Sequence, residues 1–193
     1  MSDLKILITG GLGYLGGRIA DFLHKNHSEY TIVLGTSRKI SKFPEWTKPF
    51  EIVQLNILDT ASIGKIVSKN FHVIIHLAGL NEHDSFNDIK SAWETNALGT
   101  QSLLSIASQK QIEKFIYFST FHVYGSCNEI ITEKSPTLPH HPYATTHRSA
   151  EDMVRFFQYY KGMDTLTLRL SNGYGYPMDS GVNRWTLVFN DLC

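Results

Sequence analysis

Near its N-terminus the chain reads Thr9-Gly10-Gly11-Leu12-Gly13-Tyr14-Leu15-Gly16. A β-type run, Leu4 to Ile8, precedes these residues, and a helical pattern that continues to about Lys25 follows them. The pattern predicts a strand, a tight turn at Gly10, and a helix that begins where Gly13 leaves room for a pyrophosphate. Gly16 would let the helix pack closely on the sheet, and N–H groups at the helix start would bind the phosphates. Because glycines also collect in ordinary turns, a simple turn is the alternative.

The composition excludes several classes of protein. The 193 residues are enough for one substantial core, and eighteen basic residues balance eighteen acidic ones. No overall charge therefore favours nucleic acid or an anionic membrane, and we expect neither as a partner. No apolar run approaches the length of a membrane span, and the start of the chain leaves no room for a signal peptide, so we expect a cytoplasmic protein. The nine His lack the spacing of metal ligands, so we predict no metal site.

Strands and helices are predicted to alternate along the rest of the chain, which indicates an α/β protein. The run Val73-Ile74-Ile75-His76-Leu77 is apolar almost throughout, as in a parallel strand that is buried on both faces. Further β-type runs lie at 31–34, 50–55, 115–118 and 166–170, and helical patterns lie at 62–68, 88–109 and 143–160. Within the helix at 88–109, we expect Trp93 and Asn96 on the same inward face. A last helical pattern runs from Val182 to Cys193 without a cap, as in a truncated chain.

Seven short motifs follow one another in an order that is far more specific than any one of them. They are Thr9 to Gly16, Asn56 to Asp59, His76 to Leu80, Asn96 to Thr100, Phe118 to Gly125, Pro142-Tyr143 and Leu168 to Asn172. In these motifs the chain resembles the extended short-chain dehydrogenase/reductases, often called the NAD-dependent epimerase/dehydratase family of nucleotide-sugar enzymes. The resemblance implies a doubly wound parallel sheet, the Rossmann fold, with residues 1–171 as a dinucleotide-binding domain. Residues 172–193 would begin a substrate-binding lobe that is largely absent.

The resemblance also implies which residues bind the cofactor. They lie in the glycine turn, beside the adenine and at the end of the fourth strand: Gly10, Gly13, Tyr14, Leu15, Gly16, Asn56, Ile57, Leu77, Ala78 and Gly79. Family members commonly have Asp where this chain has Asn56. We include Asn96 in the cofactor site, because the family uses this Asn to stabilise the active-site helix.

Cofactor choice is predicted from the end of the second strand, where an acidic side chain would accept the ribose hydroxyls of NAD and repel the extra phosphate of NADP. The matching residue here is Gly35, and Arg38 and Lys39 follow it. This layout is similar to that of NADP-using members, so we predict NADP in preference to NAD. The alternative is that Arg38 and Lys39 belong to a solvated basic loop.

The candidate catalytic residues are Thr120, Tyr143 and His147. By resemblance, Thr120 donates a hydrogen bond to the substrate oxygen that is oxidised, and Tyr143 takes its proton while hydride leaves for nicotinamide. The family has Lys one helical turn after this Tyr, and this chain has His147, which is shorter and mostly neutral at pH 7. Whether His147 is catalytic or an unused surface residue stays open. Asn172 matches a contact to the substrate's phosphates.

Two functions from different classes remain. The first is an NADP-binding oxidoreductase or epimerase that acts on a nucleotide sugar, and the second is a dinucleotide-binding module without turnover. Dehydration is not expected, because Phe121 and His122 occupy the positions of the acidic pair that eliminates water in the dehydratase branch.

We also predict a homodimer through the helices at 88–109 and 143–160. The second of these helices is apolar on two faces, and only one face can meet the sheet. Its outward apolar residues are Met153, Phe156 and Tyr160.

Overall fold

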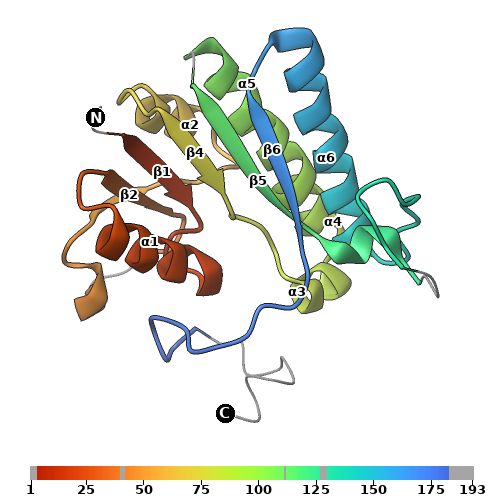
Figure 1. Ribbon diagram of the computed structural model, residues 1–193, viewed down its shortest axis with the longest axis horizontal. Coiled ribbons are helices and arrows are strands. Elements are labelled where there is room, and N and C mark those ends of the chain that lie inside the picture. Colours follow the sequence, from red (N-terminus) through yellow and green to blue (C-terminus); the bar gives the residue numbers. More distant parts are fainter. Residues whose placement is uncertain (1–3, 40–41, 111, 127–129, 183–193) are drawn as a thin grey trace.

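The computed structural model describes residues 4–39, 42–110, 112–126 and 130–182 as one six-stranded sheet with helices on both faces (Figure 1). The strands are β1 (Lys5–Thr9), β2 (Thr31–Thr36), β3 (Glu51–Gln54), β4 (Val73–His76), β5 (Lys114–Thr120) and β6 (Thr165–Leu170). All neighbouring strands are parallel and their order is β3-β2-β1-β4-β5-β6. This is the predicted doubly wound Rossmann order, with the direction of winding reversed between β1 and β4.

The helices are α1 (Tyr14–Asn26), α2 (Thr60–Val67), α3 (Glu82–Asn87), α4 (Ile89–Ala92), α5 (Thr100–Gln109) and α6 (Pro142–Lys161). Two short 3-10 helices, η1 (Glu45–Thr47) and η3 (Phe121–Tyr124), and one π-helix, η2 (Trp93–Gly99), complete the described elements. None of the described helices combines the length and the apolar character that crossing a membrane requires.

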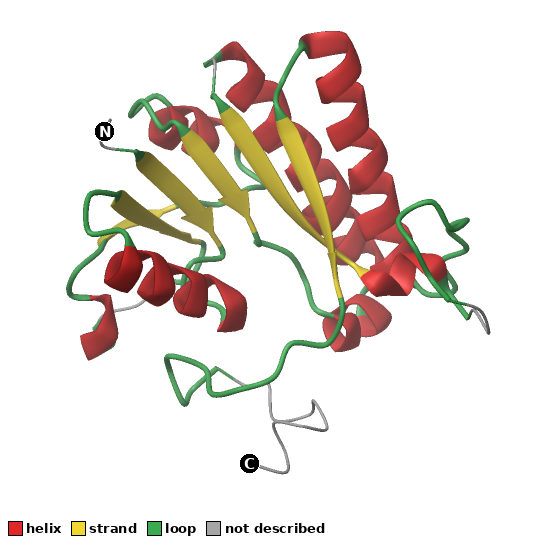
Figure 2. Ribbon diagram, viewed as in Figure 1, coloured by secondary structure: helices red, strands yellow, loops and turns green. Residues whose placement is uncertain are grey.

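Helices cover both faces of the sheet (Figure 2). Alternating side chains of the strands supply two cores, one on each face. On one face Leu7, Val33 and Ile74 pack under α2, α5 and α6, whereas on the other Ile6 and Ile8 pack under α1. The predicted burial of the fourth strand on both faces is therefore confirmed, because Ile74 and Ile75 belong to opposite cores.

The helical pattern at 88–109 is interrupted by the π-helix. Here the structure corrects the sequence interpretation: Trp93 is 40% exposed whereas Asn96 is 2% exposed, so the two residues do not share an inward face. In an α-helix, two residues three positions apart lie on nearly the same face. The wider turn of a π-helix places them on different faces. The helix α3 was also missing from the prediction.

The predicted helix at 143–160 is confirmed as α6. The imidazole of His141 caps its start by accepting the N–H of Ala144 at 3.3 Å, and Gly162, with φ of 68°, ends it in the left-handed conformation. Ala150, Val154 and Phe157 are buried, whereas the predicted second apolar face, with Met153, Phe156 and Tyr160, is exposed. The helix expected after Val182 lies outside the described residues.

Candidate functional site

A groove of about 780 Å³ opens at the carboxyl ends of the strands, where the direction of winding reverses. This is where doubly wound sheets bind ligands. Most of the residues predicted for the site line it: Gly10, Gly13, Tyr14, Leu15, Gly16, Arg38, Asn56, Ile57, Leu77, Ala78, Gly79, Thr120, Tyr143, His147 and Asn172. Two predicted residues, Lys39 and Asn96, are not among its lining residues.

The glycine turn has the geometry that requires glycine. Gly10 has φ of 68°, and a Cβ there would lie 3.0 Å from the backbone of Leu77 and Ala78. A Cβ on Gly16 would collide with the carbonyl oxygen of Gly10, so the third glycine lets α1 approach the turn itself rather than, as we expected, the sheet. Gly13 is the N-cap and offers no side-chain acceptor, and the first turn of α1 holds no acidic residue. Nothing in that turn therefore competes with a phosphate for the helix start.

His76 joins the glycine turn to the helices behind the groove. Its place in the motif His76 to Leu80 did not predict this role. Its Nδ1 lies 2.6 Å from the Thr9 hydroxyl and its Nε2 lies 2.9 Å from the Thr100 hydroxyl. Thr100 donates to the Asn96 carbonyl, so its oxygen accepts from His76 Nε2–H. Thr9 accepts the N–H groups of Leu77 and Ala78 and donates to Nδ1. Burial lowers the pKa of His76 to about 3, so the ring is neutral and its tautomer is fixed.

Asn96 continues these contacts toward α6. Its side-chain oxygen accepts the N–H of Leu80 at 2.7 Å, and its amide donates to the Thr146 hydroxyl at 3.1 Å. Thr146 lies 3.0 Å from the Tyr143 carbonyl oxygen and donates toward it. Asn96 thus holds the start of α6 against the loop after β4, which makes it a positioning residue behind the groove rather than a residue of its wall.

Where β2 borders the groove, this strand extends two residues further than the predicted run at 31–34, and Gly35 lies inside it. A Cβ on Gly35 would meet the Leu55 side chain at 2.9 Å, so this position is packed toward Leu55. Thr36 and Arg38 line the groove instead. Asn56 caps its own turn by accepting the N–H of Leu58.

At the other end of the groove lie Thr120 and Tyr143. Thr120 is 4% exposed at the end of β5, and its hydroxyl accepts the N–H of His122 at 3.3 Å. Tyr143 lies in the first turn of α6, and its ring centroid is 4.2 Å from that of His147. The fold thus places Thr120 and Tyr143, which are 23 positions apart in the sequence, in the wall of the same groove.

His147 is buried rather than at the surface, with 7% of its area exposed. Its Nδ1 lies 2.9 Å from the Tyr143 carbonyl oxygen, which can only accept, so Nδ1 carries the proton. Burial lowers the pKa of His147 to about 4, although the bond to the carbonyl acts in the opposite direction. The ring is therefore neutral near pH 7, with an unprotonated Nε2, and supplies no positive charge to Tyr143.

A buried ion pair that the sequence did not reveal anchors α6 to the sheet. Glu151 of α6 is 3% exposed and accepts two bonds from Arg169 of β6, at 2.9 and 2.7 Å, and a third from the Ser119 hydroxyl at 2.6 Å. The guanidinium of Arg169 also lies 4.7 Å from the Tyr124 ring centre. The hydrogen bonds to the Glu151 carboxylate raise the pKa of Arg169 above its ordinary value, so the guanidinium stays charged.

The described part of the C-terminal stretch, 171–182, crosses the open side of the groove near α1. Tyr14 donates to the Gly175 carbonyl at 3.0 Å, and Arg18 donates to the Tyr176 carbonyl at 2.9 Å. Asn172 enters the groove wall through this segment.

Residues 6–188 match the model of the "NAD dependent epimerase/dehydratase family". The chain is 33% identical to a dTDP-D-glucose 4,6-dehydratase from Dictyostelium discoideum, over 90% of the chain and 45% of that protein. It is 31% identical to a putative UDP-glucose 4-epimerase from Methanocaldococcus jannaschii, over 90% of the chain and 57% of the relative. The chain thus spans about half the length of the curated relatives it matches.

Solved structures share the fold. A Thermotoga maritima UDP-glucose 4-epimerase with UDP-glucose superposes with a TM-score of 0.81 at 26% identity, over 91% of this chain and 58% of that one. A Bacillus cereus UDP-glucuronic acid 4-epimerase in complex with NAD gives a TM-score of 0.82 at 26% identity, over 98% and 61%.

Proposed function

Because the chain belongs to the NAD dependent epimerase/dehydratase family, we propose that it binds a nicotinamide dinucleotide in the groove and supports hydride transfer to and from a nucleotide sugar. The observation that carries this proposal is the groove itself, which joins the glycine turn at one end to Thr120 and Tyr143 at the other. Both curated relatives described above act, by name, on nucleotide sugars.

The residues present fit the cofactor. Gly10 and Gly13 keep side chains out of the phosphate position, and the helix start has neither a side-chain cap nor an acidic residue in its first turn. Ala78 and Gly79 keep the floor of the groove low where β4 ends. When bound, the nicotinamide supplies the hydride acceptor.

In this proposal Tyr143 exchanges a proton with the substrate hydroxyl, and Thr120 donates a hydrogen bond to the same oxygen. His147 does not lower the pKa of Tyr143 by charge, because it is neutral and buried. Its Nε2 is an acceptor beside the Tyr143 ring, suited to a hydroxyl of the cofactor or substrate. We therefore propose a slow enzyme at neutral pH. The neutral His147 also favours the second candidate, a dinucleotide-binding module without turnover.

The test measures NADPH and NADH binding by fluorescence, and turnover of UDP- and dTDP-linked hexoses, in the chain and in a version extended to the length of its relatives. Tyr143→Phe should leave cofactor binding unchanged and lower turnover by about 10²-fold or more. Tyr159→Phe is the matched control, because Tyr159 is 76% exposed. Binding without turnover in both lengths would favour the second candidate, and absence of cofactor binding by the parent would contradict both candidates.

We propose further that NADP is preferred to NAD, because Arg38 lines the groove where the extra phosphate lies and no carboxylate of the second strand opposes it. The expected preference is about tenfold, or 1.4 kcal/mol. Arg38→Ala should remove it. Lys39→Ala should not, because Lys39 is outside the groove wall. Equal affinity for the two cofactors, or a preference for NAD, would contradict this proposal. NAD is the cofactor in the solved Bacillus cereus structure.

A homodimer is also proposed. Met153, Phe156 and Tyr160 expose 37%, 42% and 79% of their areas along α6, and Leu98 exposes 58% on the neighbouring η2. Several large apolar side chains exposed along one helix are typical of a surface that another protein chain covers. Light scattering should give a dimer at micromolar concentration and a monomer for Phe156→Glu, and a monomeric parent would contradict the proposal.

A further inference from the structure

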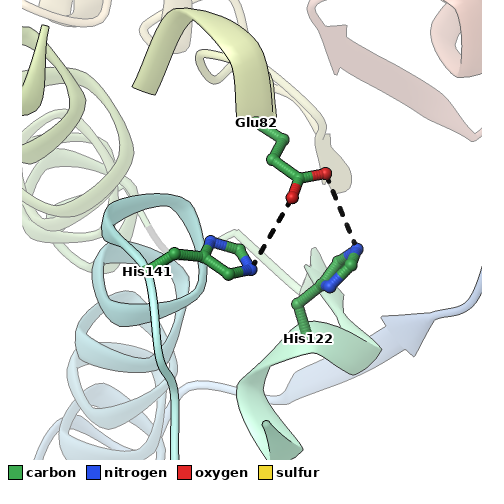
Figure 3. A group of neighbouring side chains, drawn as sticks. All are labelled: Glu82, His122 and His141. Carbon is green, nitrogen blue, oxygen red and sulfur yellow. Dashed lines mark ion pairs between the residues drawn. The ribbon is translucent and has the colours of Figure 1, made fainter. Parts of the chain in front are cut away.

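Three metal-binding side chains from distant parts of the chain point toward one another at the rim of the groove (Figure 3). Glu82 is the first residue of α3, His122 lies in η3, and His141 is the N-cap of α6. The Glu82 oxygens lie 3.9 Å from His122 Nε2 and 3.8 Å from His141 Nε2. All three ligand atoms lie within 4.8 Å of one another.

The donor set suits a divalent transition metal. Two imidazoles and one carboxylate bind Zn²⁺ in catalytic zinc sites, where a further position stays open to water or substrate. Bonds of about 2.0 to 2.2 Å would draw the ligand atoms to roughly 3.3 Å from one another. The two Glu82 distances involve different carboxylate oxygens, and separations within the group extend up to 4.8 Å, so the ligand atoms must draw together by about 0.5 Å to at most about 1.5 Å. Glu82 is 49% exposed, so its side chain is able to make its share of this adjustment.

Neighbouring rings hold the two imidazoles in place. The Phe121 ring lies 4.2 Å from that of His122, and the Phe86 ring stacks on that of His141 with centroids 5.3 Å apart. The His122 and His141 rings themselves are 5.2 Å apart. The ligands are thus pre-positioned on three elements rather than carried on one flexible loop.

One interaction competes with a metal. The His141 Nδ1 accepts the N–H of Ala144, and a metal on Nε2 requires the proton to move to Nδ1, which ends this cap. The bond is long, at 3.3 Å, and a helix cap contributes only about 1 kcal/mol. Structural zinc binding contributes several times this amount, so the cap does not prevent it.

We propose that Glu82, His122 and His141 bind a divalent transition-metal ion, with Zn²⁺ as its representative. Glu82 and His122 also line the groove, so the ion lies at its rim and water or a ligand oxygen completes its coordination. The site needs no dinucleotide, so it stands or falls independently of the function proposed above.

The test is calorimetric titration of ZnCl₂ into the chain without cofactor. The parent should bind one Zn²⁺ with micromolar affinity or tighter. His141→Asn, His122→Asn and Glu82→Gln should each weaken binding at least about tenfold, as loss of even indirect support does at metal sites. His83→Asn is the matched control, because it removes an exposed imidazole next to Glu82 without touching the cluster.

His141→Asn separates metal loss from unfolding, because Asn is among the best N-cap residues and preserves the start of α6. Its melting temperature without metal should equal that of the parent, while the stabilisation by Zn²⁺ should be lost. Absence of Zn²⁺ binding by the parent would overturn the proposal. Binding of equal strength in all three variants would also overturn it, since the ion would then sit on other side chains.

Discussion

The glycine turn faces the groove with backbone and small residues, whereas the opposite end faces it with the side chains of Thr120, Tyr143 and His147. At the turn, the backbone leaves room only for glycine, because a Cβ on Gly10 or Gly16 would meet backbone atoms. At the other end the wall depends on side chains, and one of them, His147, is neutral near pH 7. The wall at the turn can therefore keep its shape while the side chains at the opposite end change.

Lowering the pH should affect both ends, through His76 beside the glycine turn and His147 beside Tyr143. The folded pKa values of His76 and His147, about 3 and 4, lie below the unfolded value of about 6.5. Below pH 6.5 the unfolded chain binds more protons, so stability is complete above that pH and is lost as the pH falls toward 4 and 3. At pH 5 the two rings should together cost about 4 kcal/mol.

Urea denaturation between pH 7.5 and 5 measures this loss. The His147→Gln variant should lose about half of this 4 kcal/mol, because His76 is then the only one of the two buried rings that remains. A stability that stays level down to pH 5 would show that these rings are not buried and neutral as described.

Gly10→Ala tests the backbone end. The left-handed φ and a contact of 3.0 Å with backbone should together cost about 3 kcal/mol of stability and remove dinucleotide binding. The same change at Gly64, in α2, meets no atom within 4 Å and should stabilise the chain by about 0.5 to 1 kcal/mol. Opposite signs for the two substitutions are expected in urea titrations, and equal effects would contradict this account of the turn.

Glu151→Gln tests whether α6 is anchored to the sheet through its buried ion pair. Removing the carboxylate leaves Arg169 partly buried without its partner, and about 2 to 3 kcal/mol of stability should be lost. The exposed pair of Asp164 with Lys114, whose side chains are 60% and 40% exposed, provides the control, since Asp164→Asn should change stability by less than about 0.5 kcal/mol. The free energy of unfolding of both variants is measured by chemical denaturation. A similar small loss of stability in both would show that the ion pair of Glu151 and Arg169 does not anchor α6.

His147→Lys should produce the smallest change. A cation beside Tyr143 lowers its pKa, but the burial that keeps His147 neutral also opposes a charged Lys. Turnover should rise about tenfold, corresponding to 1.4 kcal/mol, and the rise of activity with pH should move to lower pH. Turnover is measured from pH 6 to pH 10 in the extended chain. A fall in activity would instead indicate that His147 itself contributes to turnover.

The sequence was sufficient to predict the α/β alternation, the glycine turn and most of the groove wall, because these depend on local patterns and on motif order. Contacts between distant residues were not predictable in this way. His76 meets Thr9 and Thr100, Glu151 meets Arg169, and Glu82 meets His122 and His141 only after the sheet has formed. Metal-ligand spacing along the chain could not reveal the last group, since its members come from three elements. The exposure of Trp93 was missed because a π-helix leaves no simple periodic signal.

The position of β1 in the middle of the sheet has a consequence for the order of assembly during synthesis. The Thr9 hydroxyl beside the glycine turn accepts the N–H of Ala78, a residue 69 positions later. Until a ribosome has made residues 73–76, β1 can pair only with β2 on one side, and β4, the partner for its other edge, is still missing. The nascent turn is therefore completed only when β4 and the residues after it have emerged, and a pause in translation before that point leaves one edge of the first strand open to other chains.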